Sequence, residues 1–257
     1  LFLLIYEVEM IVLDTQGIVL RAVKYRDKDL ILTIFTRKYG KVSAIAKGAQ
    51  GQKSRFLSAS QLFSYNNYNM RKQKDMFTLY QADNIKSFYN ISMDFESFSY
   101  ASFIIKLVEA NIVEGQPNNR LFELLAQTLF LYSEKIDNKN LVLDAFLLKF
   151  VDYMGYRPQL DRCTICGNKN LKYAVFSVED GGLVCNNCHK KEKFFIKLDQ
   201  TTISLMQYIL NNDIIVCSKA KVAEVLVREL FSLLKIYLVN YFENVSFKSL
   251  DLLKTLK

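Results

Sequence analysis

Two Cys-x-x-Cys pairs constrain this chain more tightly than any other feature of its 257 residues. Cys163 and Cys166 form the first pair, Cys185 and Cys188 form the second, and 18 residues separate the pairs. Two residues between thiolates let one tight turn present both sulfurs to an ion about 2.3 Å away, and two such turns complete a tetrahedron. The spacing falls within the range of four-cysteine zinc sites. We therefore predict one zinc ion, with a hairpin around residues 180–182 between the pairs.

Four thiolates fill the coordination shell of zinc and leave no position for water or substrate, so a structural metal is expected. Other interpretations explain fewer of the cysteines. Cys185 to His189 matches the c-type haem attachment pattern, but that chemistry leaves the first pair unexplained. A zinc deaminase needs a histidine ahead of its cysteines, and a redox pair does not require four cysteines. We expect His189 to be an exposed neighbour of the site and Cys217 to be an ordinary buried thiol.

The length of the chain suits about one and a half to two domains. Apolar and β-branched runs predict strands at about 18–23, 29–37, 42–47, 60–70 and 76–88. Five short antiparallel strands with no intervening helix favour a closed barrel of the OB type. A simple meander sheet is the competing interpretation.

From residue 92 the apolar period becomes helical, and we predict helices at about 92–114, 121–132, 141–154, 201–210 and 222–242. The predicted fold class is therefore α+β and multidomain. Residues 1–90 would form the five-stranded OB-type barrel. Residues 91–257 would form a helical domain with the four-cysteine zinc module inserted at 160–190.

The charge of the chain is unevenly placed. The net charge is +8, and residues 1–90 hold 14 Lys and Arg against 7 Asp and Glu, whereas residues 91–160 hold 6 against 9. A polyanionic partner should therefore meet the barrel first. The candidate phosphate-binding residues are Arg21, Lys24, Arg37, Lys38, Lys41, Lys47, Lys53, Arg55, Arg71 and Lys72.

Aromatic residues are interleaved with these cations, namely Tyr25, Phe35, Tyr39, Phe63, Tyr65 and Tyr68. Cations along a groove neutralise phosphates, and rings stack on unpaired bases irrespective of sequence. Core packing is the competing interpretation for single rings, Phe35 and Phe63 in particular, and solvation is the competing interpretation for many of the lysines. Taken together, the cluster favours nucleic-acid binding.

Several functions are not expected. No stretch reaches the roughly 18–20 apolar residues that span a bilayer. Separately, Met10 is a candidate start, which would make residues 1–9 upstream or added sequence. We expect a cytoplasmic, nucleoid-associated protein with no membrane partner. The loop at 48–54 has Gln52 before Lys53, where a phosphate-binding loop needs glycine. We expect no nucleotide hydrolysis and no enzyme activity.

Seven segments, in this order, resemble the RecO family of bacterial recombination mediators: residues 14–20, 35–50 (FTRKYGKVSAIAKGAQ), 53–56, 100–110, 155–158, 160–163 and 181–185. The resemblance extends from about residue 10 to 250. It implies an OB domain, a helical domain and an embedded zinc module. It also implies binding to single- and double-stranded DNA, strand annealing, and work with RecR and the C-terminal tail of single-strand-binding protein (SSB) to load RecA.

The resemblance implies DNA contacts only for the basic residues within 35–50 and 53–56. The other candidate cations are inferred from charge alone. The family implies no active site. A zinc-ribbon scaffold that binds only proteins is the alternative from a different class, and an enzyme is a third. DNA binding by residues 10–90 would separate the first two.

Overall fold

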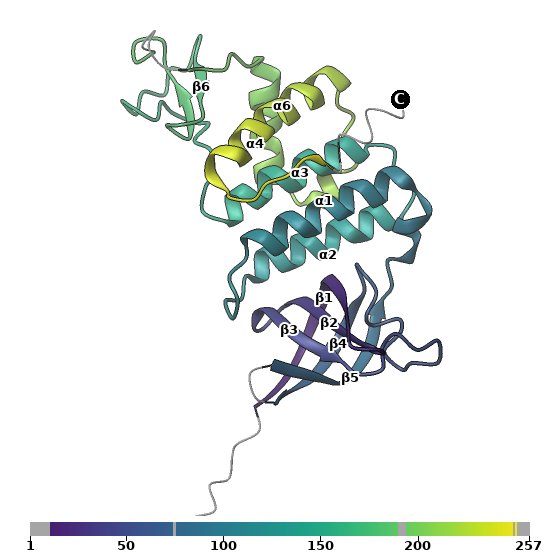
Figure 1. The fold of residues 1–257 in the computed structure, drawn as a ribbon. Coiled ribbons are helices and arrows are strands. Elements are labelled where there is room, and N and C mark those ends of the chain that lie inside the picture. Colours follow the sequence, from purple (N-terminus) through teal and green to yellow (C-terminus); the bar gives the residue numbers. More distant parts are fainter. Residues whose placement is uncertain (1–10, 74–75, 190–193, 249, 251–257) are drawn as a thin grey trace, which may run out of the picture. The chain divides into compact units, whose positions relative to one another are not determined.

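The computed structural model describes residues 11–73, 76–189, 194–248 and 250 (Figure 1). The candidate start at Met10, the residues before it, and Lys74 and Asp75 lie outside them. The chain divides into two compact units. One contains the described residues up to Tyr89 together with Ile112–Phe122, and the other contains Asn90–Asn111 and the described residues from Glu123 onward.

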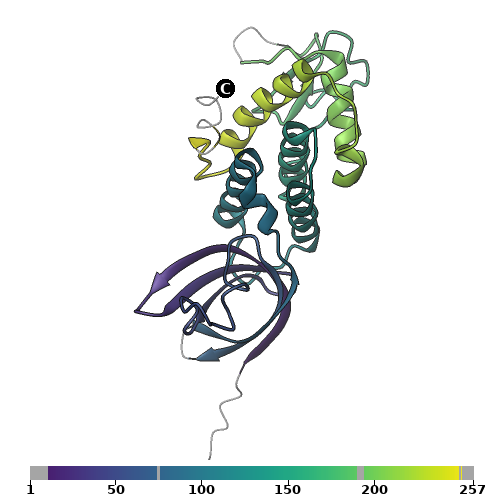
Figure 2. The same ribbon diagram turned by 90° about the vertical axis from the view of Figure 1, so that its right-hand side faces the viewer.

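The first unit is a closed five-stranded barrel, seen from its side in Figure 1 and turned in Figure 2. Its strands are β1 (Val12–Tyr25), β2 (Asp29–Thr36), β3 (Gly40–Ala46), β4 (Tyr65–Gln73) and β5 (Met76–Lys86). They close in the order β1-β2-β3-β5-β4, with β1 antiparallel to β4 and a short parallel pairing between β3 and β5. This closed order confirms the OB-type barrel and rules out the meander sheet.

The barrel core comes from the alternation of side chains along its strands, which is clearest in β3. In β3, Val42, Ala44 and Ala46 point inward and are buried, while the residues between them are half-exposed. Leu32 and Ile34 of β2 meet them inside the barrel. β1 begins earlier than predicted, because its first half pairs with β4 and its second half with β2.

The strand predicted at 60–70 begins only at residue 65. Residues 60–64 belong to an irregular loop that packs on the barrel. Phe63 is buried with a positive φ of 66°, which no strand residue adopts. The Ser64 hydroxyl donates to the carbonyl oxygens of Ala59 and Gln61 at 3.1 and 2.8 Å, which fixes a turn.

The segment Ile112–Phe122 completes the barrel unit. Gly40 has a φ of +65°, and a Cβ there would lie 2.2 Å from the carbonyl oxygen of Gln116. Only glycine permits that approach. The ring of Phe122 packs edge-on against Phe35, with centroids 5.5 Å apart, and covers the outer side of β2 at that point.

The second unit is helical. It contains α1 (Phe95–Asn111), α3 (Lys139–Tyr153), α4 (Gln200–Asn211), α5 (Ile214–Cys217), α6 (Glu224–Tyr241) and all but the first four residues of α2 (Asn119–Ser133), and the 3-10 helix η1 (Tyr89–Met93) leads into it. The five predicted helices are confirmed with boundaries shifted by a few residues, and α5 was not predicted. Asp94 caps α1, because its carboxylate accepts from the Ser97 amide at 2.8 Å. None of the described helices is long and apolar enough to cross a membrane.

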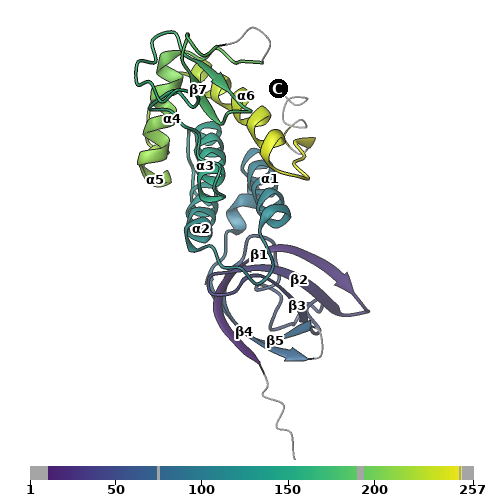
Figure 3. The same cartoon turned by 90° about the vertical axis from the view of Figure 1, so that its left-hand side faces the viewer.

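Helix α3 forms the core of this unit (Figure 3). Every residue from Leu141 to Val151 is buried, and α3 contacts α1, α4, α5 and α6. One of these residues is an acid: neither carboxylate oxygen of Asp144 has a hydrogen-bond partner within the described residues. Burial raises the pKa of the Asp144 carboxyl well above its usual value, so the neutral form is favoured.

Candidate metal centre and nucleic-acid interface

The predicted hairpin between the cysteine pairs is present. β6 (Val175–Ser177) and β7 (Gly182–Val184) pair antiparallel. Gln159, which precedes the first pair, donates its amide to the Gly181 carbonyl and accepts from the Leu183 amide, both at 2.9 Å. A Cβ on Gly182 would lie 2.3 Å from the Gln159 carbonyl oxygen, so this contact requires glycine. These backbone contacts place Gln159, which precedes the first cysteine pair, beside β7, the strand that leads into the second cysteine pair.

The four cysteine sulfurs converge. The Sγ atoms of Cys163, Cys166, Cys185 and Cys188 all lie within 4.8 Å of one another. Those of Cys166 and Cys185 are 3.7 Å apart, and four sulfurs at about 2.3 Å from one ion in a tetrahedron would be about 3.8 Å apart. A backbone hydrogen bond closes the turn, or knuckle, at each cysteine pair. The Gly167 amide donates to the Cys163 carbonyl oxygen at 2.9 Å, and the Cys188 amide donates to the Cys185 carbonyl oxygen at 3.0 Å. The donor set fits a tetrahedral, thiophilic cation.

The electrostatics of the cluster favour the same conclusion. Burial raises the pKa of the Cys163 thiol, but backbone N–H groups of Cys166, Cys185 and Ile165 donate to its sulfur and together lower that pKa to about 6. Hydrogen bonding with Cys166 raises the pKa of the Cys188 thiol to about 12. The Cys163 sulfur therefore holds negative charge readily, whereas the Cys188 thiol resists ionisation. A divalent cation at the centre would neutralise the repulsion between thiolates.

Apart from the buried hairpin residues Phe176, Val178 and Leu183, the module buries few side chains around its sulfurs. Only Cys163, Val184 and Cys185 are buried in its apolar cluster, with a few half-buried neighbours around them. His189 is exposed, packs edge-on against Phe195 with centroids 4.4 Å apart, and does not join the sulfur cluster. Cys217 lies in α5, where burial raises the pKa of its thiol. Both are placed as the sequence predicted.

The candidate phosphate-binding cations form separate groups on the barrel rather than one patch. Arg37 and Lys38 stand exposed at the turn that joins β2 to β3. Lys38 Nζ donates to the carbonyl oxygen of Asp14 at 3.0 Å, which fixes this turn beside β1. Lys41 follows on β3 but is only half-exposed, and its carbonyl accepts from the Gly115 amide.

A second group stands at the opposite end of β2. Leu30 of β2 pairs with Lys24 on β1 and with Ala46 on β3. Lys47 follows Ala46 in the sequence, so Lys24 and Lys47 both lie near the start of β2. Both lysines are exposed, as is Arg21 opposite Thr33 between the two groups. At about 3.3 Å per residue, the two ends of β2 place their cations roughly 23 Å apart.

A third group surrounds Tyr80 on β5. The Arg71 guanidinium carbon lies 3.6 Å from the centroid of the Tyr80 ring. Arg55, in the loop between β3 and β4, lies over the ring of Phe56 at 4.6 Å. Lys53 and Lys72, close in sequence to these arginines, are both exposed.

The aromatic side chains are only partly as predicted. Phe35, Phe63 and Tyr68 are buried, so for these three rings the competing interpretation, core packing, holds. Tyr68 is fully enclosed and donates to the Ala59 carbonyl at 2.7 Å, and burial raises the pKa of its hydroxyl. Tyr68 lies in the barrel core, Phe35 packs against Phe122, and Phe63 lies in the loop that packs on the barrel. An apolar ring gains more from burial than from exposure.

The remaining rings of the set, Tyr25, Tyr39 and Tyr65, are half-buried. Tyr65 is held by a 2.7 Å hydrogen bond from its hydroxyl to Gln16 Oε1. The exposed ring beside the cations is instead Tyr80, which the sequence analysis did not select. Its only signal in the sequence is its place between apolar Leu79 and polar Gln81 in a predicted strand.

Two family models match nearly the whole chain: "Recombination protein O N terminal" over residues 10–88 and "Recombination protein O C terminal" over residues 92–251. A protein named DNA repair protein RecO from Alkaliphilus metalliredigens is 39% identical over 94% of this chain and 98% of its own length. Proteins of the same name from Thermoanaerobacter sp. and Acetivibrio thermocellus are 34% and 32% identical, again over nearly the full length of both chains. The chain therefore belongs to the RecO family of DNA repair proteins.

Proposed function

We propose that this chain is a recombination mediator without enzyme activity. It binds single- and double-stranded DNA through the barrel and anneals complementary strands. With RecR, and with SSB docked through its C-terminal tail, it helps load RecA onto SSB-coated single strands. Family membership supports the repair role, and the observation that carries the DNA-binding proposal is the placement of exposed cations at both ends of β2 and around Tyr80.

The spacing of these cations suits a long polyanion. About 23 Å of barrel corresponds to roughly seven phosphates of one strand at about 3.4 Å per phosphate. Phosphate contacts carry no sequence information, so binding should tolerate any sequence. Two strands repel each other, and a basic surface that holds both lowers that barrier while leaving base edges free to pair. No nucleotide needs to be hydrolysed for this step.

We propose that the cysteine cluster holds one zinc ion. Cys163, Cys166, Cys185 and Cys188 would be its ligands, and zinc prefers four thiolates in a tetrahedron. Four protein ligands leave no position for water, so the ion would act on folding and not on substrate. This role agrees with the proposal that the protein is not an enzyme.

A salt series with the full-length protein tests DNA binding through the barrel. Lys24, Lys47 and Lys53, all exposed on the barrel unit, are replaced together by alanine. For each phosphate that one of these lysines neutralises, the slope of log affinity against log salt should flatten by about 0.7 on a single strand and by about 0.9 on a duplex.

A matched control removes the same charge from the helical unit. Lys106, Lys219 and Lys221 are exposed there and are replaced together by alanine. This triple variant should keep the slope of the original protein. If the control flattens the slope and the barrel variant does not, the DNA site is not on the barrel.

An annealing time course tests the mediator role. Complementary strands coated with full-length SSB should pair in the presence of the protein without ATP. Removing the acidic tail of SSB should slow pairing if the tail docks on this protein. A requirement for ATP would contradict the mechanism, and indifference to the tail would contradict the SSB assignment alone.

A further inference from the structure

A small recess opens on the barrel where β5 leaves β3. The two strands pair only at Ala44–Phe77 and Ile45–Thr78. Beyond that point the loop between β3 and β4 lies beside β5, and a recess of about 260 Å³ is lined by Arg55, Phe56, Tyr80, Gln81 and Ala82. Pockets that enclose a whole drug-sized ligand hold about 300–1,000 Å³, so this recess suits one planar group.

A β-bulge aims Tyr80 at the recess. Leu79 pairs with Met70 and Gln81 pairs with Asn69, so Tyr80 is the extra residue that has no register partner. Ordinary alternation would turn Gln81 inward after an outward Tyr80, yet both are exposed, and Tyr80 keeps 51% of its surface accessible. Bulges of this kind redirect side chains and are frequent next to binding sites.

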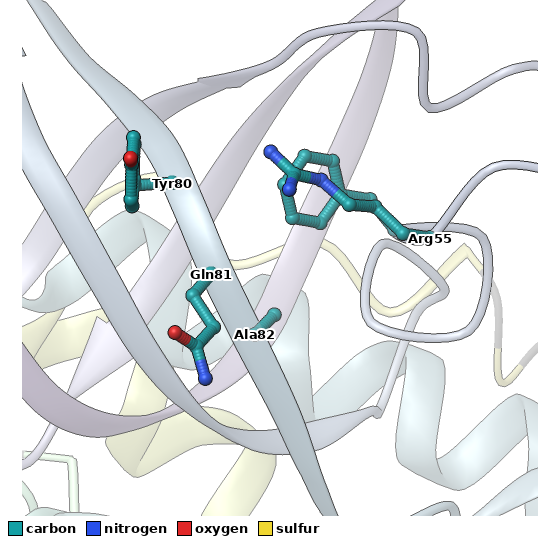
Figure 4. Close-up of a pocket in the computed structure, with 5 residues that line it drawn as sticks. Arg55, Tyr80, Gln81 and Ala82 are labelled. Atoms are coloured by element: carbon teal, nitrogen blue, oxygen red, sulfur yellow. The ribbon is translucent and has the colours of Figure 1, made fainter.

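One guanidinium group lines the recess, and a second stacks on the tyrosine ring that lines it. Arg71 stacks on one face of the Tyr80 ring at 3.6 Å, and its Nε is buried without a hydrogen-bond partner in the described part of the chain. Stacking on Arg71 therefore fixes the orientation of the ring. Arg55 extends from the loop toward β5 (Figure 4), and its guanidinium carbon lies 4.6 Å from the centroid of the Phe56 ring. The acid on β5, Asp83, accepts a 2.9 Å hydrogen bond from the side-chain amide nitrogen of Gln81.

We propose that this recess binds one unpaired base of single-stranded DNA, stacked on the exposed face of Tyr80, with an adjacent phosphate on Arg55. The proposal rests on the proposed DNA-binding function and adds a site that separates single strands from duplexes. A cation groove treats both as polyanions, whereas an aromatic platform gains only from a base that has left its stack. A base in a duplex would first have to unpair.

The test uses the full-length protein and three probes of equal length: a single strand of thymidines, the same strand with abasic residues, and a duplex. Tyr80→Ala should weaken binding to the thymidine strand about ten-fold, which corresponds to about 1.4 kcal/mol. Its affinities for the abasic strand and the duplex should not change. Tyr80→Leu, which keeps apolar contact without a ring, should behave in the same way, and Tyr80→Phe should bind like the original protein.

The outcomes separate this site from the general proposal. If the original protein binds the thymidine strand and neither Tyr80→Ala nor Tyr80→Leu weakens that binding, the base site is wrong and the DNA-binding function stands. Equal losses on the thymidine and abasic strands would also overturn base stacking. If the original protein binds none of the three probes, DNA binding through the barrel fails, and the base site fails with it.

Discussion

The barrel and the four-cysteine module are both small β-structures, but different forces hold them. The barrel closes its hydrogen-bond ladder on itself and buries a continuous core. That core contains Leu13, Val19, Leu32, Ile34, Val42, Ala44, Ala46, Ala49, Phe56, Ala59, Tyr68, Met70 and Leu79. The module has a hairpin of two three-residue strands, and in the cluster around its sulfurs only three residues are buried, two of which are cysteines.

The difference shows what each region needs in order to fold. A closed barrel has no free sheet edge and excludes water from its interior, so apolar burial alone can stabilise it. Around the sulfurs so few side chains are buried that burial alone cannot offset the conformational entropy of the ordered turns there. A metal ion that binds only the folded arrangement would supply the difference. The two regions should therefore respond oppositely to metal removal and to core substitutions.

The largest expected effect is loss of the metal. Cys163→Ser should release the ion and unfold the module, since structural zinc in small domains contributes about 10–16 kcal/mol of apparent binding free energy at neutral pH. Metal analysis and limited proteolysis of residues 160–190 measure both effects. Cys217→Ser removes a thiol outside the sulfur cluster and should keep one metal per chain. A metal-free original protein, or a Cys163→Ser variant with an intact module, would contradict the comparison.

The second prediction concerns the backbone contact that aligns the two knuckles. Gly182→Ala places a methyl group 2.3 Å from the Gln159 carbonyl oxygen, so the two segments must separate, at a cost of about 3 kcal/mol. Gly167→Ala meets no atom within 4 Å and bears only the strain of its φ of +73°, about 1 kcal/mol. Competition with a chelator measures metal affinity in both variants. Equal affinities would show that the Gln159 contact does not align the site.

The two regions also differ in how far the sequence predicts them. The hairpin of the module and the convergence of its four cysteines are predicted from sequence, because the Cys-x-x-Cys spacing and the turn at residues 180–182 are local features. The strands of the barrel were predicted as well, since alternation is local. The direction of single side chains was not, because bulges at Leu20 and Tyr80 shift the alternation and are set by the partner strands.

Other features depend on contacts between distant parts of the chain. The segment Ile112–Phe122 joins the barrel because it bridges to Gly40 and packs on Phe35, which no local pattern reveals. The separation of the candidate cations into groups follows from register, which places Lys24 and Lys47 at one end of β2 and Arg37 at the other. The charge count places the excess of cations in the first ninety residues, but it does not predict where on the barrel each cation lies.

A substitution in the barrel core sharpens the comparison from the other side. The Tyr68 hydroxyl is fully buried, donates to the Ala59 carbonyl and accepts from Asn66 Nδ2, both at 2.7 Å. Tyr68→Phe should therefore destabilise the barrel by about 2 kcal/mol while leaving the metal content unchanged. Tyr173→Phe removes the same group from a ring that is 77% exposed and should have no effect. Chemical denaturation of both variants checks this, and metal loss in Tyr68→Phe would contradict the independence of the two regions.

In the helical unit, Asp144 should make stability depend on pH. Burial raises the pKa of its carboxyl, with the hydroxyls of Tyr100 and Tyr132 close enough to feel its charge. The folded state therefore holds a proton that the unfolded state releases above about pH 4, and stability falls by up to about 1.4 kcal/mol per pH unit as pH rises toward the folded pKa. Asp144→Asn should remove that slope. An unchanged slope would show that Asp144 is ionised when folded.

The smallest effect belongs to a surface ion pair in the same unit, and its sign is opposite. Lys139 Nζ lies 2.7 Å from Asp94 Oδ2, and chiefly this hydrogen bond lowers the pKa of the Asp94 carboxyl from 3.8 to about 2. Its contribution is present above pH 3.8 and is lost as pH falls toward 2.

The Asp94 side chain is 49% exposed, so solvent screens the pair and Asp94→Asn should lower stability at pH 7 by less than about 1 kcal/mol. The exposed Asp137→Asn is the matched control and should change nothing. Denaturation at pH 7 in low and high salt measures the difference, which should shrink in high salt. A loss as large as that of Tyr68→Phe would mean that surface charge, and not the buried run of α3, stabilises the helical unit.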